Sequence, residues 1–268
     1  MSILTIGILL SSRILLAQST GTEQLTVPLT NPGKPYSLNV SLLNGSIHVS
    51  AHAGKDILID VVPRSSRDDG DDDAGNGMKR ISRANGYEVV AKENDNVVTV
   101  SNQSSQRTLN LNLKIPQDVK LKLHTVNNGT IEVDGIKGEL EINNVNGEIK
   151  LTNISGSVVA TTVNGPVTVI FNTITPGTPM AFSTLNGNVD VTFPGGTKSN
   201  LKMKSDRGEV YSDFDVEVDK SQQKVTRTNE SGMHKITVDD WVYGKINGGG
   251  SEVLMKNMNG NIYIRKAK

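Results

Sequence analysis

The side chains that could do chemistry in this sequence are few and scattered. The acidic run DDGDDD, residues 68–73, could hold a cation loosely, but it does not match the ligand spacing of an EF-hand. His48 and His52 share one strand face, and four residues at ~3.3 Å each place them about 13 Å apart, too far to hold one metal ion. His124 and His234 are isolated. We therefore predict no metal site and read the acidic run as a solvated loop.

Catalytic motifs give no stronger signal. The sequence has no GxSxG and no GxxxxGK[ST] phosphate loop, and INGGG at residues 246–250 reads as a glycine turn. The carboxylates nearest to a polysaccharide-cleaving arrangement are Glu132, Glu141 and Glu148. They fall on alternate half-repeats, so we do not expect them to converge. We predict no catalytic and no cofactor-binding residues.

The densest aromatic spot is DDWVYGK, residues 239–245. Trp241 and Tyr243 could contact carbohydrate there, although large aromatic side chains more often cover a core.

Composition narrows the class of protein. Of 268 residues, 28 are Lys or Arg and 28 are Asp or Glu, which gives no electrostatic case for nucleic acid or anionic lipid. No cysteine is present, which excludes disulfides and thiolate metal sites. Aromatic residues make up only 4% and glycines number 26, so we expect a core of Ile, Val and Leu in strands joined by tight turns.

The first residues, MSILTIGILLSSRILLAQST, resemble a signal peptide. Residues 3–17 are mostly apolar and Ala17-Gln18 is a plausible cleavage point, but a basic start is missing and Arg13 interrupts the apolar run. We predict a signal peptide over residues 1–18, with a short membrane anchor or a misplaced start as alternatives. The mature chain is then exported and has no transmembrane segment, because no later stretch is long and apolar enough.

Residues 19–125 read as strands with a charged insertion. Leu38, Val40 and Leu42 alternate with polar residues, and the same alternation returns over residues 109–123. Between them lies PRSSRDDGDDDAGNGMKRISRANG, residues 63–86, which has no period and is predicted to be a surface loop.

From residue 126 to the end, the sequence repeats. Glycines stand nine residues apart at positions 129, 138, 147, 156 and 165. Apolar residues lie two and four positions after each glycine, and also seven positions after the first four, at Ile136, Val145, Ile154 and Val163. The fifth repeat breaks at this last position with Asn172. Since Asn-Gly recurs only every eighteen residues, the unit is two unlike halves, each a strand and a glycine turn.

Two folds fit such units: an antiparallel meander with Asn-Gly hairpins, and a parallel solenoid with two strands per coil. Apolar residues at the seventh position favour the solenoid, where a corner side chain can point inward. We expect Asn128, Asn146 and Asn164 to form an asparagine ladder, and Glu132 to lie over Lys150. Tolerance of positive φ would explain Asn and Gly at the corners. These corners lack the Asp of calcium-binding GGxGxD turns, so calcium is not expected there.

The stretch VNNGTIEVDGIKGELEINNVNGEIKLTNISGSVVATTVNG, with the later SDRGEVYSDFD and INGGGSEVLMKNMNGNIYIRK, resembles a bacterial β-strand-repeat family of putative adhesins, DUF4097. The resemblance covers roughly residues 36–268 and is strongest over 121–264. It implies an exported protein with an elongated β-helix-like fold, and it supplies no catalytic motif.

The sequence thus predicts an all-β, elongated parallel β-helix or β-solenoid-like stack of about 18-residue two-strand coils, with N-terminal capping strands. The N-terminal strands and residues 213–245 are expected to cover the two ends of the stack and so prevent edge-to-edge assembly. We predict an exported, non-enzymatic structural or binding protein of the bacterial cell envelope, periplasmic or on the cell surface, whose ligand is a carbohydrate or a protein. Alternatives are a β-helix polysaccharide lyase or hydrolase, and an accessory to an envelope signalling system.

Overall fold

The structure is a computed structural model that describes residues 23–64, 86–102, 107–127, 129–222, 225–230, 233–238 and 240–268, without the side chains of residues 222–239. The predicted leader (1–18), the acidic run (68–73) and Asn128 lie outside the described residues. The all-β prediction is confirmed: the described chain consists of strands and turns, apart from one 3-10 turn at Lys220–Gln222.

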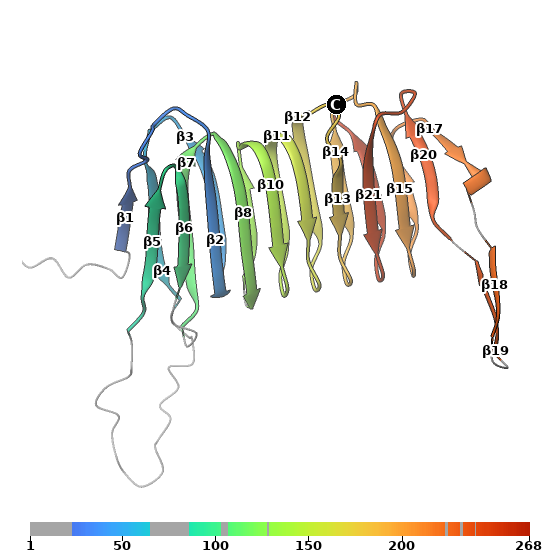
Figure 1. Cartoon of the computed structure of the whole chain (residues 1–268), viewed down its shortest axis with the longest axis horizontal. Helices are drawn as coiled ribbons and strands as arrows, with labels where there is room; N and C mark the ends of the chain where they lie inside the picture. Colours follow the sequence, from blue (N-terminus) through green and yellow to red (C-terminus); the bar gives the residue numbers. More distant parts are fainter. Residues whose placement is uncertain are drawn as a thin grey trace, which may run out of the picture.

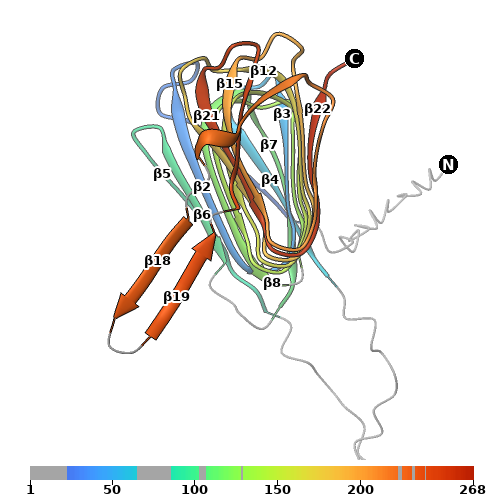
Figure 2. The ribbon, with the colours of Figure 1, turned by 90° about the vertical axis from the view of Figure 1, so that its right-hand side faces the viewer.

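The strands form two long faces that share β11, whose two halves lie on different faces (Figures 1 and 2). Face A contains, in spatial order, β5 (Val89–Asn94), β6 (Val97–Asn102), β2 (Tyr36–Asn44), β8 (Asp118–Asn127), β10 (Lys137–Asn144), the second half of β11 (Ile149–Thr161), β13 (Met180–Ser183), β21 (Ser251–Asn257), β15 (Ser199–Ser205), β20 (Val242–Ile246) and β17 (Val216–Asp219).

Face B lies opposite and is built in the same way. It contains, in spatial order, β1 (Glu23–Val27), β4 (Ile57–Pro63), β7 (Leu109–Pro116), β3 (Ile47–His52), β9 (Ile131–Asp134), the first half of β11, β12 (Val167–Ile174), β14 (Val189–Phe193), β22 (Ile262–Lys266) and β16 (Val210–Ser212). A separate hairpin, β18 (Val225–Glu230) with β19 (Met233–Val238), projects beyond the stack (Figure 2).

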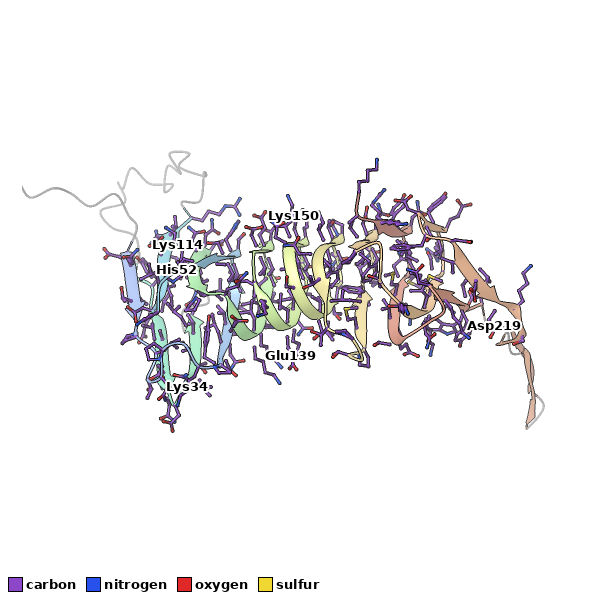
Figure 3. All side chains as sticks on the ribbon, turned by 90° about the horizontal axis from the view of Figure 1, so that it is seen from above. Lys34, His52, Lys114, Glu139, Lys150 and Asp219 are labelled. Atoms are coloured by element: carbon purple, nitrogen blue, oxygen red, sulfur yellow. The ribbon has the colours of Figure 1, made fainter. Side chains whose placement is uncertain are left out.

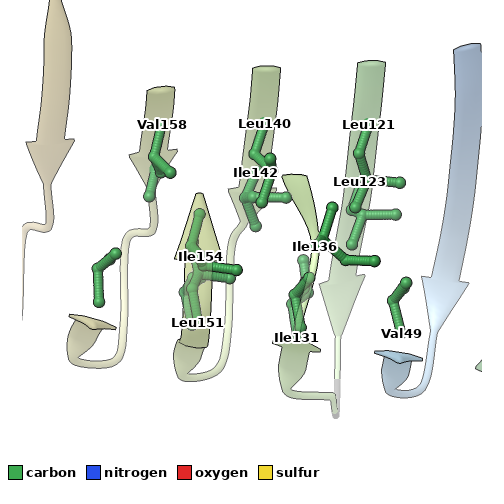
Figure 4. Packing of buried hydrophobic residues seen from close by; sticks show 14 of the residues in the cluster. Val49, Leu121, Leu123, Ile131, Ile136, Leu140, Ile142, Leu151, Ile154 and Val158 are labelled. Atoms are coloured by element: carbon green, nitrogen blue, oxygen red, sulfur yellow. The ribbon is translucent and has the colours of Figure 1, made fainter. Parts of the chain in front are cut away.

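The repeats pair in parallel, as the solenoid alternative predicts. Ile131, Ile149 and Val167 are cross-strand neighbours, each eighteen residues after the last. Two positions further along, Val133, Leu151 and Val169 pair in the same way. Apolar residues at these two offsets are buried throughout the five repeats, and successive coils stack them into one continuous core (Figure 4).

The two corners of a coil differ, which corrects one prediction. At the first corner Ile136 and Ile154 are fully buried, and we call it the isoleucine corner. At the Asn-Gly corner the matching residues do not point inward: Val145 is half-buried and Val163 is 37% exposed. The inward space at this corner is occupied by polar side chains, so apolar residues are left on the outside.

Those polar side chains hold neighbouring coils together. Asn144 Nδ2 donates a hydrogen bond to the carbonyl of Gly129 at 3.0 Å, and Thr162 Oγ1 donates to that of Gly147 at 3.0 Å. The same contact recurs in four further coils, from Thr125 to Gly45, Thr184 to Gly165, Asn257 to Gly187 and Ser205 to Gly260. Each bond satisfies a backbone carbonyl that the turn would otherwise leave unpaired.

The predicted asparagine ladder is present and longer than expected. Asn164 Nδ2 donates to Asn146 Oδ1 at 2.8 Å. The ladder continues through Asn186 and Asn259 on one side, and on the other Asn146 Nδ2 donates to Asn127 Oδ1 at 3.1 Å, while the predicted member Asn128 is not among the described residues. The prediction that these asparagines exploit positive φ is wrong, since they are not among the residues with positive φ. Asn153, at the isoleucine corner, does adopt φ 55°.

Coils do not stack in sequence order, which the repeat pattern did not indicate. The coil β2–β3 lies between β6–β7 and β8–β9. At the other end, β21–β22 lies between β13–β14 and β15–β16. Both ends of the stack then finish in antiparallel strands: β5 and the pair β4–β1 at one end, β20 and β17 at the other.

Strands from residues 19–125 and from 126–268 thus join the same two faces, and the division of the chain at this point stays a prediction.

Candidate binding surfaces

The outward side chains of the two faces point in opposite directions. Glu139 lies on one flank, while Lys114 and Lys150 lie on the other (Figure 3). Each flank carries a shallow groove among the described residues. We call the groove on face A the face-A groove and that on face B the face-B groove.

The face-A groove has a volume of about 580 Å³. Charged side chains of β8 and β10 cross its middle, between β2 and β11: Lys120 pairs with Glu139 at 3.2 Å and Lys122 with Glu141 at 2.8 Å. Beyond them the side chains become short, and Val159 on β11 is 41% exposed. The groove is therefore a neutral, partly apolar surface beside a row of paired charges.

The pairing with Lys122 affects the protonation of the Glu141 carboxyl. A hydrogen bond from Lys122 holds the pKa of the Glu141 carboxyl below its ordinary value, with a further lowering from Asn143, while partial desolvation opposes the shift. A general acid for glycoside cleavage needs a raised pKa. Glu141 is instead an ionised partner of Lys122.

The face-B groove, about 410 Å³, is lined by two lysines and two carboxylates, as the face-A groove is, and also by His48. Glu132 Oε2 lies 3.2 Å from His48 Nδ1, so the partner of Glu132 is His48. Lys150 is the cross-strand neighbour of Glu132, as predicted, but no ion pair between them is observed among the described contacts. Asp134 Oδ1 accepts hydrogen bonds from Thr152 at 2.7 Å and from Asn153 at 2.8 Å.

The three predicted carboxylates lie apart. Glu132 is on β9 of face B, Glu141 is on β10 of face A, and Glu148 precedes β11 at the Asn-Gly corner. Each groove does contain two carboxylates, but both come from one strand and both have partners, as with Glu132 and Asp134. An arrangement of opposed carboxylates from neighbouring coils is not present in the described part of the chain.

The histidines have structural contacts. His52 Nδ1 accepts a hydrogen bond from the Gly54 amide at 3.1 Å, so its Nε2 carries the proton and donates to the carbonyl of Asp56 at 2.8 Å. His48 faces Glu132, and His124 lies on β8. Within the described ranges no three His, Asp or Glu side chains are grouped to hold a metal ion. The side chain of His234 lies outside those ranges.

The aromatic side chains are distributed differently from the prediction. Trp241 is half-buried with Lys202 Nζ 4.9 Å from its ring centre. A second group was missed: Tyr211 and Tyr263 stack at 5.4 Å on the outside of face B. Arg265 lies over Tyr263. The two tyrosines are 52 residues apart in sequence and become neighbours only because β22 inserts beside β16.

The repeats, their parallel register and their glycine corners are the features by which this chain can be compared with known proteins. The family model for Toastrack DUF4097 matches residues 14–247.

The chain belongs to the Toastrack DUF4097 family.

Two solved structures are similar to this Toastrack chain. One is a "putative cell adhesion protein" from Clostridium sporogenes, with 13% identity, a TM-score of 0.42, and coverage of 92% of this chain and 100% of the other. The other is a "putative adhesin" from Bacteroides fragilis, with 12% identity, a TM-score of 0.41, and coverage of 92% and 98%. None of the curated proteins matches this sequence. No helix among the described residues has the length and hydrophobicity to cross a membrane.

Proposed function

We propose that this Toastrack protein is an exported, non-enzymatic binding module of the bacterial cell envelope, similar to an adhesin, and that its face-A groove contacts the ligand. The observation that carries the proposal is the groove itself, an exposed apolar floor at Val159 beside self-paired charges. Paired charges create little net field, so contact there depends on shape and on hydrogen bonding.

The stack is well suited to contact with an extended ligand. Parallel strands lie about 4.8 Å apart, and the core fixes every outward side chain in register with its neighbours. A glycan chain or a protein surface can therefore meet a rigid, repetitive flank at little cost in ordering the protein. The chain's equal numbers of basic and acidic residues do not support nucleic acid as the partner.

The second candidate is a polysaccharide lyase or hydrolase that acts at the face-B groove. This groove gathers His48, Glu132, Asp134 and Lys150, the residue types that such reactions use. Against it stand the 3.2 Å contact of Glu132 with His48 and the two hydrogen bonds of Asp134, which engage both carboxylates within the protein.

A glycan array and a panel of cell-surface proteins, probed with the exported chain, tests the first proposal. Val159→Lys should weaken binding at least about tenfold by placing a charge on the apolar floor. Ile170→Lys is the matched control, because Ile170 is 39% exposed on the opposite face. Equal binding by both variants and the wild type would reject the face-A groove as the contact.

A reducing-sugar assay on the bound glycans separates the two candidates. Release of sugar ends that stops with Glu132→Gln or Asp134→Asn would replace the binding proposal by the enzyme. We expect no release.

A further inference from the structure

The two stacked tyrosines at the end of face B form a surface that neither groove includes, and we call it the tyrosine platform. Tyr263 on β22 and Tyr211 on β16 are cross-strand neighbours, and their ring centres lie 5.4 Å apart with 11° between the ring planes. Among the described strands β16 pairs only with β22, so it is the last strand of face B. Tyr263 covers one face of the Tyr211 ring, yet Tyr211 is 46% exposed. The opposite face of this ring is therefore open to solvent.

Side chains outside the core hold the platform in place. Arg265 donates to both carboxylate oxygens of Asp190 on β14, from Nε at 2.7 Å and from Nη2 at 2.8 Å, and its guanidinium lies 5.1 Å from the Tyr263 ring centre. Asn261 donates to the Tyr263 hydroxyl at 2.9 Å and accepts from the Glu209 amide at 3.0 Å. Rings fixed in this way lose little conformational freedom when a ligand binds, so the platform is preorganised.

The backbone of β16 offers hydrogen-bonding groups on the same open side. The Glu209 carbonyl and the Asp213 amide bond to β22. Backbone groups of successive residues in a strand point to opposite edges, so those of Val210 and Ser212 point away from β22. No other described strand pairs with them. A molecule that lies against the outer face of Tyr211 therefore also lies beside backbone N–H and C=O groups.

A carboxylate completes the edge of the platform. Glu209 is exposed and accepts a hydrogen bond from the Tyr211 hydroxyl, which raises the pKa of that hydroxyl above its ordinary value. The ring of Tyr211 is thus uncharged near neutral pH. A carboxylate has two oxygens and can accept several hydrogen bonds, so Glu209 can also accept from a ligand hydroxyl.

These properties fit a sugar ring better than a cation or an added strand. A sugar has apolar C–H bonds on its faces, which pack on an aromatic ring, and hydroxyls at its edge, which both donate and accept hydrogen bonds. Aromatic sites for organic cations enclose the cation as a cage, whereas the platform offers a single open ring face. β16 is only three residues long, which leaves few backbone groups for pairing with a partner strand.

We propose that the tyrosine platform binds one sugar ring of a glycan, with a C–H face of the sugar on the outer face of Tyr211 and with sugar hydroxyls bonded to Glu209 and to the backbone of β16. The platform lies on face B, on the flank opposite the face-A groove, so its test does not depend on the binding role proposed for that groove.

The test uses the full chain and the methyl glycosides of glucose, galactose, N-acetylglucosamine and glucuronic acid at millimolar concentration. Saturation-transfer NMR detects binding and shows which sugar protons lie against the protein, and titration measures the affinity. We expect at least one glycoside to bind, with the strongest saturation on the protons of one ring face. Tyr211→Ala should weaken binding roughly three- to tenfold, while Tyr211→Phe keeps the ring and should stay within about twofold of the wild type.

Two control variants locate the contact. Tyr243→Ala removes an outward, half-buried tyrosine on β20 of face A and should leave the affinity unchanged. Val159→Lys, which tests the face-A groove, should also leave it unchanged, so the two proposals can fail independently. Thermal melting of each variant checks that it is folded.

Three results would overturn the proposal. The first is absence of binding across the glycosides. The second is an affinity that survives Tyr211→Ala or falls equally in Tyr211→Phe, because the contact would then not depend on the ring. The third is binding of tetramethylammonium, but of no glycoside, in a way that Tyr211→Ala abolishes, which would identify a cation site instead.

Discussion

At the scale of single residues, the corners depend on close contact between stacked turns. Glycine is required at the Asn-Gly corner because neighbouring coils approach too closely for a side chain, and in some coils, as at Gly165 with φ 154°, its backbone angle adds a second reason. A Cβ atom on Gly147 would lie 1.9 Å from the carbonyl oxygen of Gly129, yet Gly147 is not among the residues with positive φ. This contact is backbone against backbone and cannot be relieved by rotating a side chain.

Gly147→Ala should therefore lower the free energy of unfolding by about 3 kcal/mol, the upper end of the cost of overpacking. Gly196→Ala is the control, because a Cβ there meets no atom within 4 Å and φ is not in the left-handed region. Its effect should stay within about 0.5 kcal/mol. Urea unfolding monitored by circular dichroism measures both, and equal stability of the two variants would contradict the close-contact explanation.

Substitutions at Asn144 can measure how much a corner hydrogen bond contributes to the free energy of unfolding. Equivalent coils use threonine to donate to the glycine carbonyl, as Thr162 does to Gly147. Asn144→Thr should keep the bond to Gly129, while Asn144→Val has the same shape without the hydroxyl. We expect the valine variant to be less stable than the threonine variant by about 1–2 kcal/mol in urea unfolding. If the two unfold at the same urea concentration, the bond contributes nothing.

At the scale of elements, the two corners of each coil have opposite requirements. The isoleucine corner closes the core, while the Asn-Gly corner leaves Leu43, Val163, Leu185 and Met258 between 36% and 43% exposed. Val163, Leu185 and Met258 lie on successive coils beside the asparagine ladder, which produces an aliphatic ridge along one edge of the molecule.

Ile154 and Val163 occupy the same offset in alternate half-repeats and allow a direct comparison. Ile154→Ala should cost about 2–4 kcal/mol because it leaves a cavity in the core. Val163→Ala should cost less than about 1 kcal/mol because the side chain is already partly in water. Chemical denaturation of both variants checks the difference, and similar losses would mean that both corners close the core.

The inserted coil β21–β22 joins the coil β13–β14 to the coil β15–β16, and these two coils do not pair with each other directly. β13 and β15 each pair with β21, and β14 and β16 each pair with β22. Ending the chain after Gly250 should therefore remove amide protection from β15, β16, β17 and β20, while β8 and β10 stay protected. Hydrogen exchange with mass spectrometry measures this, and removal of only Ala267 and Lys268 is the control. Retained protection in β15 would contradict the role of the insertion.

At the scale of the whole molecule, the balance of charges and the aliphatic ridge both favour association between copies of the protein. The chain has 28 basic and 28 acidic residues and a net charge of zero at pH 7 with neutral histidines. Molecules without net charge do not repel one another, so the exposed ridge can bring copies together.

Solubility should therefore be lowest near pH 7 and rise on either side, as measured by the polyethylene glycol concentration that precipitates the protein at several pH values. Leu185→Lys adds charge to the ridge and should raise solubility at pH 7 with little change in stability, since Leu185 is 43% exposed. A minimum far from neutral pH, or no effect of the lysine, would show that charge balance and the ridge do not control association.

The sequence by itself determined the repeat, the inward positions and the location of the corners. A period of eighteen residues with fixed apolar offsets leaves one stacking register that buries the apolar side chains two and four positions after each glycine, and the glycine and asparagine columns follow from that register. The same repeat showed its break at Asn172, where the strand register shifts and the buried Phe171 becomes the cross-strand partner of Ile154.

Only the tertiary structure decided the order in which the coils stack, and therefore which residues from distant parts of the sequence become neighbours. Parallel strands pair through backbone groups that are the same in every coil, so any coil of the right period can lie beside any other. The sequence pattern cannot distinguish β8–β9 beside β2–β3 from β8–β9 beside β6–β7. The stacked tyrosines on β16 and β22 are neighbours because the coil β21–β22 inserts before the end of the stack.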